Sequence, residues 1–379
     1  MGAALIVDAV RSPMGRGKAG GALSGTHPVD LLAGVLAALV ERTGIDPATV
    51  DDVLVGCVGQ NLEQSATPGR QAWLAAGYPE HVPSVTIERK CGSSQQAVDF
   101  AHWGIAAGAY DLAVAGGVES MSRVPMGSAR GDADPFGPAV RARYPRLVPQ
   151  GVSAELVAER WKLSRGDLDA FAARSHRLAA RASFAGEIVP IGGVTVDETI
   201  RPGTSVEVLA GLRTSFKSAA FPELDLKVTA GNSSQLTDGA AALLLASEER
   251  AAALGLRPRA RIVASAVCGD DPVMMLTGPI PATRKVLAKA GLSIGDIDAV
   301  EVNEAFAPVP LAWLAEFDLD PERLNPRGGA IALGHPLGAS GARLMTTLIN
   351  HLEQTGGRYG LQTMCEAGGM ANATVIERL

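Results

Sequence analysis

Two of the four cysteines could act as nucleophile or acid/base, because each follows an apolar run and enters a small-residue turn. The first, Cys91, stands in the stretch RKCGSSQQA, directly ahead of an Ala-rich segment that we expect to be a helix. A thiol at a helix start meets free N–H groups and the positive end of the helix dipole, and both favour the thiolate. Arg89 and Lys90 add positive charge. The alternative is a small buried hydrophobe, and the local sequence alone leaves both interpretations open.

The second cysteine, Cys365, follows the strand-like run Leu361–Met364 and begins the stretch CEAGG. A turn of this kind presents backbone N–H groups, which can stabilise an oxyanion. Asn303, in the stretch NEAFA, follows another strand-like run, Ala299–Val302. A side-chain amide at a strand end can hold a water molecule or an oxyanion, so both strand ends are candidate parts of a catalytic site.

His335 lies in the glycine-rich stretch GGAIALGHPLGASG, residues 328–341. Glycines let the backbone and a ligand approach the imidazole closely, and Pro336 fixes the turn that follows it. A single histidine is usually structural, but this setting favours a functional one. The sequence has no HExxH or CxxC spacing, so we expect no metal site and no disulfide framework. Reduced thiols make the cytoplasm the expected location.

The elements that must position these residues alternate between strand-like and helical segments. Apolar runs at Ala4–Val10, Val53–Val58 and Asp111–Ala115 predict strands, the last ending at Gly116. The segment Pro28–Thr43 predicts a long helix. This rhythm favours an α/β fold in which sheets are flanked by helices.

The first and last thirds of the chain resemble each other. Gly44–Gly56 aligns with Gly291–Asn303 at a shift of 247 residues, and Leu5–Val10 aligns with Ile262–Val267 at a shift of 257. We therefore predict two homologous halves. The first covers residues 1–118 and resumes at 228–256, and the second covers 257–379. Residues 119–227 form an inserted domain, richer in Arg and Pro, with a helix that begins after the capping residue Ser164.

Composition excludes several classes of protein. Of 379 residues, 47% are hydrophobic and 20% are charged, which indicates a folded globular protein. The net charge of -6 disfavours a nucleic-acid binder. Between Arg141 and Lys227 there are 13 basic and 10 acidic residues, which fits either an anionic ligand or a solvated mixed-charge surface. No apolar run reaches the roughly 18 residues of a membrane helix, so we expect no membrane span.

These motifs, taken together and in order, resemble the thiolase family, and the resemblance spans essentially the whole chain. It is carried by CGSSQQA, ESMSRVPM, TAGNSSQLTDGAA, GPIPA, NEAFA, GGAIALGHPLGASGAR and CEAGG. The resemblance implies the thiolase fold, in which two repeated βαβαβαββ halves form a five-layer αβαβα core with an inserted loop domain. The internal repeat and the insertion match this plan.

The resemblance also implies a reaction, acyl-CoA + acetyl-CoA ⇌ CoA + 3-oxoacyl-CoA, as in fatty acid β-oxidation, with coenzyme A esters as substrates and no resident cofactor. Cys91 would be the acylated nucleophile, and His335 would accept its proton. Cys365 would move the proton at the acetyl carbon. One oxyanion hole would use His335 and a water molecule on Asn303, and the other would use the N–H groups of Cys91 and Ala367.

Coenzyme A would contact two residues that the resemblance identifies: Ser234 would meet the pantetheine arm, and Arg213 would lie against the adenine. For Arg213, a solvated surface position is the alternative. One departure is Ala367, because the family usually ends in C-x-G-G-G and alanine resists a positive φ. Another is Pro149-Gln150-Gly151, where acetoacetyl-specific relatives have His-Met before the glycine. This departure favours a broader or bulkier acyl group.

Family members associate through the edge of the first-half sheet, so a homodimer or homotetramer is expected, with residues 60–83 as the interface loop. Two other functions remain as alternatives. A ketoacyl synthase of the same fold would use a His pair or a His/Asn set beside its cysteine, whereas this chain has Cys365. A non-catalytic acyl-CoA-binding protein could keep the fold, but it would not require Cys91, His335, Asn303 and Cys365 together.

Overall fold

The computed structural model describes residues 4–379, and its first half follows the expected order of elements. That half comprises β1 (Leu5–Arg11), α1 (Pro28–Thr43), β3 (Asp52–Gly56), α2 (Pro68–Ala75), β4 (Ser84–Ile87), α3 (Ser93–Ala106), β5 (Leu112–Ser120) and β6 (Thr237–Ala246). The second half comprises β7 (Ala260–Gly269), α9 (Pro279–Ala290), β8 (Ala299–Val302), α10 (Pro308–Glu316), α11 (Ala330–Leu333), α12 (Ser340–Thr355), β9 (Tyr359–Glu366) and β10 (Met370–Arg378).

The two halves repeat local structure as well as sequence. In each, a helix ends at a glycine in the left-handed region, Gly44 with φ 66° and Gly291 with φ 67°. A 3₁₀ turn and a strand follow in both halves, which explains the alignment of the two segments. The second half departs at one place. Where the first half has β4, the second has a single parallel bridge between Val300 and Leu324.

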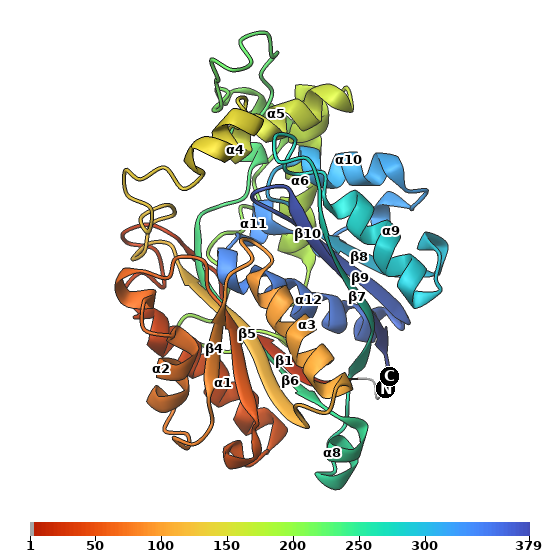
Figure 1. Cartoon of the computed structure of the whole chain (residues 1–379). Coiled ribbons are helices and arrows are strands. Elements are labelled where there is room, and N and C mark those ends of the chain that lie inside the picture. Colours follow the sequence, from red (N-terminus) through yellow and green to blue (C-terminus); the bar gives the residue numbers. More distant parts are fainter. Residues whose placement is uncertain (1–3) are drawn as a thin grey trace.

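The strands run in the order β4-β3-β5-β6-β1-β7-β10-β9-β8 (Figure 1). Within residues 4–379, the two half-sheets meet where Leu5 and Ile6 of β1 pair with Arg261 and Ala260 of β7. A two-residue strand, β2 (Gly15–Arg16), pairs with β6. The pairs β3–β4, β3–β5 and β8–β9 are parallel, and the pairing between the other named strands is antiparallel.

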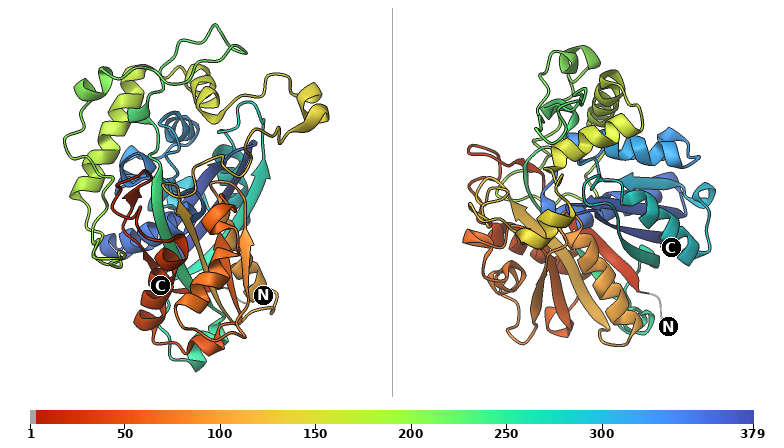
Figure 2. Two further views of the ribbon diagram at one scale, coloured as in Figure 1. Left: turned by 90° about the vertical axis from the view of Figure 1, so that its left-hand side faces the viewer. Right: turned by 45° about the horizontal axis from the view of Figure 1, so that its top comes forward.

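The helices complete five layers, which confirms the expected thiolase architecture. α1 and α2 pack on the outer face of the first half-sheet, and α9 and α10 pack on the second. α3 and α12 pack against each other in the middle layer, where they contact strands of both halves (Figures 1 and 2). Each apolar helix face is therefore buried against a sheet, as a layered α/β domain requires.

The chain between β5 and β6 carries α4 (Gly137–Arg143), α5 (Gln150–Arg160), α6 (Arg165–Arg181) and α7 (Val206–Ala210). Ser164 begins α6 with a capping box shared with Asp167, which confirms the predicted helix start. α5 packs on α10 and α6 packs on α11, so this segment covers the second half (Figure 2). A short helix, α8 (Glu248–Ala253), connects β6 to β7.

The prediction that the strand near residue 112 ends at Gly116 is wrong. β5 continues through both glycines to Ser120. The glycines serve close packing instead of a turn, because a Cβ on Gly116 would lie 2.4 Å from the carbonyl oxygen of Ala241, and one on Gly117 would lie 2.1 Å from that of Gly338.

Candidate active site

Four separate elements bring the sequence motifs to one region of the molecule. Cys91 lies in the turn between β4 and α3, and Asn303 directly follows β8. Cys365 is the second-to-last residue of β9, which is parallel to β8, so both strands end at the same edge. His335 lies in the loop between α11 and α12. The fold therefore gathers residues that are up to 274 positions apart (91 to 365).

Cys91 is buried at the entry to α3, in contact with Leu337, Leu344 and Met364. The preceding residue, Lys90, has φ 48°, a left-handed turn that redirects the chain from strand to helix. Burial, followed by the negative charge of Glu366, raises the pKa of the Cys91 thiol to about 12. The backbone N–H at the helix start and the charge of Lys90 favour the thiolate as expected, but desolvation outweighs both effects and the thiol stays neutral. Cys91 needs a proton acceptor to react.

Cys365 is also buried and neutral. Burial is the main cause of its raised pKa, and the next cause is the charge that Cys91 would carry. The two thiols are therefore electrostatic neighbours, and ionising one opposes ionising the other. Such a pair can hold protons at neutral pH and release them one at a time.

His335 is held in one tautomer by a residue that the sequence analysis missed. Its Nδ1 lies 2.6 Å from the hydroxyl oxygen of Ser340, and that hydroxyl donates its only proton to the carbonyl of Pro336 at 2.9 Å. Ser340 must then accept from Nδ1–H, which leaves the lone pair on Nε2. Nε2 lies 3.4 Å from Nδ2 of Asn303. Burial, then the charge of Arg343, lowers the pKa of His335 to about 3, so the ring is a neutral proton acceptor.

The loop that carries His335 approaches the first half closely because glycines line both sides. A Cβ on Gly338 would lie 2.7 Å from the Cα of Cys57. The N–H of Gly338 donates at 2.8 Å to the buried carboxylate of Glu119, which also accepts from the N–H groups of Val58 and Gly59. Glu119 thus ties the histidine loop to the turn after β3. Glu119 is the first residue of the motif ESMSRVPM, and the sequence alone gave no role to this residue.

Glu304 is a second buried carboxylate that connects segments around His335. Its buried carboxylate accepts from Ser175, from the side chain of Asn325, and from the backbone N–H of Ile331. These bonds join the NEAFA segment to α6 and to the start of α11. Asn303 and His335 are thereby held at a fixed separation, a role that the sequence pattern alone did not reveal.

The remaining predicted site residues are Ala367, Ser234 and Arg213. Ala367 begins the turn between β9 and β10, and the left-handed positions of that turn are taken by Gly368 and Gly369, with φ 97° and 76°. Ala367 therefore occupies its position without positive-φ strain. Ser234 donates its N–H to the carbonyl of Ala305, close to Asn303. Arg213 is exposed in the loop after α7.

Comparison with known proteins decides the family. Residues 4–249 match the model of the thiolase N-terminal domain, and residues 256–378 match that of the thiolase C-terminal domain. The chain belongs to the thiolase family. It is an acyltransferase of the thiolase type, and the family match decides against the ketoacyl synthase alternative.

Three similar proteins are named as thiolases or as an acetyl-CoA acetyltransferase. A steroid 3-ketoacyl-CoA thiolase, FadA6, from Mycobacterium tuberculosis is 50% identical, over 99% of this chain and 94% of that protein. A beta-ketoadipyl-CoA thiolase of Escherichia coli is 46% identical, over 99% of each chain. The crystal structure of a Bacillus anthracis acetyl-CoA acetyltransferase matches with a TM-score of 0.89 and 40% identity, covering 100% of this chain and 99% of that one.

Residues 4–379 show neither a metal-binding group of side chains nor a helix able to cross a membrane. No group of three or more His, Cys, Asp or Glu side chains is arranged to hold a metal ion. In the same residues, no helix has the length and apolar character needed to cross a membrane.

Proposed function

We propose that this thiolase interconverts a 3-oxoacyl-CoA and CoA with an acyl-CoA and acetyl-CoA through an acyl group on Cys91. The observation that carries the proposal is that Leu337, two residues after His335, packs against the cluster that contains Cys91, so the loop of a buried, neutral imidazole lies beside a buried, neutral thiol. Both groups are uncharged before substrate arrives. Proton transfer and attack on a thioester or ketone carbon can then proceed without a charged resting state.

In the cleavage direction, Cys91 passes its proton to Nε2 of His335 and its sulfur bonds to C3 of the 3-oxoacyl-CoA. The C2–C3 bond breaks, and the electron pair left on C2 takes the proton of Cys365, which releases acetyl-CoA. The thiol of CoA then gives its proton to Cys365 and attacks the acyl carbon. The Cys91 sulfur leaves as the acyl-CoA forms, and it recovers its proton from His335. Atoms and protons balance over the cycle.

Negative charge on the substrate oxygens requires hydrogen-bond donors in a site shielded from water. We assign the first set to His335 and to Asn303 with a water molecule, supported by the 3.4 Å contact between the two side chains. We assign the second to the N–H groups of Cys91 and Ala367, supported by the unstrained position of Ala367 in its turn. Each donor would lower the barrier by roughly 3–4 kcal/mol.

Coenzyme A esters with bulky or extended acyl groups are the proposed substrates. Two relatives are named for a steroid 3-ketoacyl-CoA and for beta-ketoadipyl-CoA, and the stretch Pro149-Gln150-Gly151 lacks the His-Met of acetoacetyl-specific thiolases. Ser234 is proposed to meet the pantetheine arm because it is bonded to the segment after Asn303. Arg213 is proposed to lie against the adenine, which its exposed position allows.

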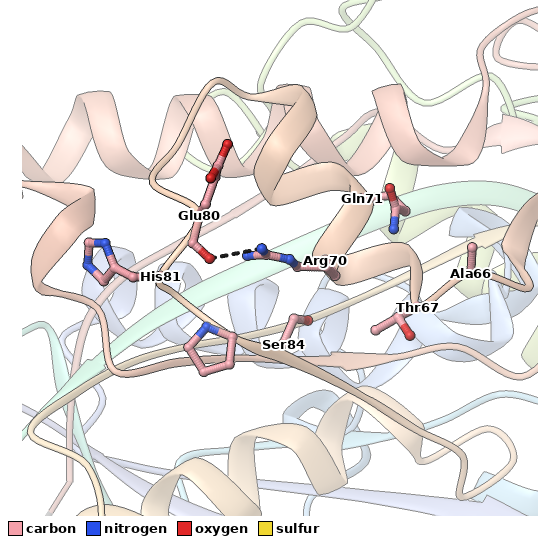
Figure 3. Close-up of a pocket in the computed structure, with 8 residues that line it drawn as sticks. Ala66, Thr67, Arg70, Gln71, Glu80, His81 and Ser84 are labelled. Atoms are coloured by element: carbon pink, nitrogen blue, oxygen red, sulfur yellow. Dashed lines mark hydrogen bonds between the residues drawn. The ribbon is translucent and has the colours of Figure 1, made fainter.

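We also propose a homodimer or homotetramer built on the edge of the first half-sheet. β4 is the terminal strand of the sheet, and a free edge with an exposed Val85 is suited to pairing with a second copy. A surface pocket of about 420 Å³ adjoins this edge, and Arg70 on its wall donates to the carbonyl of Glu80 (Figure 3). Arg70 also donates to the carbonyl of Val82. Apart from Ser84 at the start of β4, the residues that line the pocket belong to the proposed interface loop; they are Ala66, Thr67, Arg70, Gln71, Glu80, His81 and Pro83.

A reducing compartment such as the cytoplasm suits this chemistry, because Cys91 and Cys365 must remain thiols. All four cysteines are free. The mechanism is tested by brief exposure to acyl-CoA followed by mass spectrometry, which should place the acyl group on the peptide that contains Cys91. Label on Cys57 or Cys268 would contradict the assignment. Turnover of 3-oxoacyl-CoA esters of increasing size would then define the acyl group, and a protein that binds them without releasing acetyl-CoA would be a non-catalytic binder.

A further inference from the structure

The carboxyl group of Glu366 lies beside the reactive cysteines but takes no part in the mechanism above. Glu366 ends β9, directly after Cys365, and is fully buried. A Cβ built on Gly92, the residue after Cys91, would lie 2.1 Å from Oε1 of Glu366. Gly92 has φ −83°, which any residue can adopt, so the glycine is needed for the space that the carboxyl group occupies. The carboxyl group is therefore packed directly against the backbone that carries the nucleophile.

The surroundings of Glu366 are polar but leave its charge uncompensated. Within residues 4–379, neither carboxyl oxygen accepts a hydrogen bond. Asn372 donates to the carbonyl of Gly92 at 3.2 Å, and Gln96 and Asp99 follow one and two turns along the same face of α3. A buried carboxylate without a partner is far less stable than the neutral acid. Consistent with this geometry, burial raises the pKa of Glu366 to about 8.

Charged and titratable groups face Glu366 from four elements. The turn before α3 contributes one cation, Arg89, together with the carboxylate of Glu88 and the thiol of Cys91. The others are Asp99 of α3, Cys365 of β9 and Cys268 of β7. At Cys91, the charge of Lys90 acts against that of Glu366 and favours a lower pKa of the thiol. At Cys268, the charge of Lys285 has the same effect. Burial and the carboxyl groups of Asp99 and Glu88 outweigh the opposing charge of Arg89, so ionising Glu366 is disfavoured in this region.

We propose that Glu366 is a positioning residue of the thiolase reaction, which must be protonated for Cys91 to form its thiolate readily. While the carboxyl group is neutral, Cys91 can pass its proton to His335 without opposition from this side of the site. Once the carboxyl group ionises, its charge beside Gly92 opposes negative charge on the Cys91 sulfur. The inference rests on the proposed role of Cys91 as the nucleophile. It implies that a rise in pH has two opposing effects on Cys91. It favours loss of the thiol proton, and it ionises Glu366, whose charge opposes the thiolate.

The test measures the alkylation of Cys91 by iodoacetamide, peptide by peptide, from about pH 6 to about pH 10, a range that spans the titration of a raised carboxyl group. E366Q keeps the size of the side chain and removes its ionisation. We expect E366Q to react like the wild type near the acid end and about tenfold faster above about pH 8, a difference equal to one pKa unit. E88Q is the matched control, because Glu88 is also near Cys91 but is exposed and paired with Lys90, and it should follow the wild type.

Coincident profiles for E366Q and the wild type would overturn the proposal. An equal shift in E88Q would also overturn it, since the effect would then belong to general charge near the turn. If E366Q does not fold, Glu366→Met, which is apolar and of similar length, provides the same measurement. Alkylation of Cys91 requires no acyl transfer, so its result does not depend on whether Cys91 can be loaded with an acyl group. A failure of acyl loading would contradict the proposed function and not the role of Glu366.

Discussion

At the level of single residues, the chemistry of this thiolase depends on groups that are kept neutral by burial. The pKa of Cys91 is raised, that of Cys365 is raised, and that of His335 is lowered, in each case with desolvation as the largest cause. A charged thiolate–imidazolium pair is therefore not the resting state. Negative charge forms only as the substrate oxygens and their hydrogen-bond donors come together, which concentrates stabilisation in the transition state.

The two cysteines are expected to fail in different ways. Cys91→Ala should abolish both acyl loading and turnover. Cys365→Ala should still load an acyl group on Cys91 but lose turnover by roughly 10²–10⁴-fold, the usual contribution of a positioned acid or base. His335→Ala should slow loading itself. Intact-protein mass spectrometry with a steady-state assay checks all three variants. Normal loading in His335→Ala with no loading in Cys365→Ala would mean that the roles are reversed.

Ser340 provides a second test at this scale. Ser340→Ala removes the acceptor that holds Nδ1–H of His335, so the ring can adopt the unreactive tautomer or rotate. We expect kcat/KM to fall roughly tenfold, the equivalent of one lost hydrogen bond, with the unfolding temperature little changed. Thr346→Ala is the control, because Thr346 is a buried hydroxyl of the same helix that bonds only to the carbonyl of Ala342. An equal loss in the control would contradict the tautomer assignment.

At the level of elements, the site depends on how closely the His335 loop approaches β5 and the turn after β3. Gly117 and Gly338 face each other there, and Glu119 bonds across the contact. Side chains larger than hydrogen would separate the loop from Cys91. The glycine richness of the histidine motif is therefore as much a packing requirement between the two halves as a means of ligand access.

Gly117→Ala tests this contact. The new methyl group would lie 2.1 Å from the carbonyl oxygen of Gly338, and backbone on both sides cannot yield easily. We expect a loss of about 1–3 kcal/mol in unfolding free energy, typical of overpacking, together with reduced acyl loading. Urea denaturation measures the first and mass spectrometry the second. Gly203→Ala, at a glycine with no neighbouring atom within 4 Å, should change neither. Equal effects in both variants would argue against the close-contact explanation.

At the level of the whole molecule, the middle helices join two half-sheets that pair over two residues within residues 4–379, and several charged side chains are buried in the same core. Arg11 of β1 pairs with Glu187 at 2.6 Å and with Asp197 at 2.7 Å, both in the chain between β5 and β6. Glu301 of β8 and Arg343 of α12 are fully buried as well, and the charge of each acts on the other. Among these groups, Glu301 has a raised pKa, which makes stability depend on pH.

Glu301→Gln should reveal that dependence. Burial raises the pKa of Glu301 to about 8, so the folded protein keeps a proton that the unfolded chain loses above about pH 4.3. Stability from this group is therefore present at acid pH and is lost as the pH rises towards 8. The variant should be about 1–3 kcal/mol more stable than the wild type near pH 8 and equal to it near pH 4, by urea denaturation. Glu223→Gln, an exposed control, should show no such trend.

Assembly through the β4 edge is tested by Val85→Lys. A lysine at an exposed edge position opposes strand pairing between copies, so we expect this variant to shift towards the monomer in light scattering. Val85 is 42% exposed, and Val140 on α4 is 41% exposed, which makes Val140→Lys a matched control that should keep the wild-type mass. A wild-type protein that is a stable monomer would contradict the proposed assembly.

The sequence by itself determined the α/β class, the repeat, the helix from Pro28 to Thr43, and the identity of Cys91, His335, Asn303 and Cys365 as candidates. These follow from local information: hydrophobic period, capping residues and short motifs with unusual composition. The proposed domain boundaries remain predictions from the repeat and the composition, and the roles of Ser234 and Arg213 remain predictions from the resemblance.

Only the tertiary structure decided the protonation of the site. The sequence around Cys91, with a helix start and two basic residues, indicated a thiolate, but desolvation by neighbours distant in the chain reverses that balance. The tautomer of His335 requires the position of Ser340, and Gly117 lies within β5 because Gly338, 221 residues later, approaches it. Burial and long-range contact have no local signature in sequence, so the properties that depend on them appear only once the chain is folded.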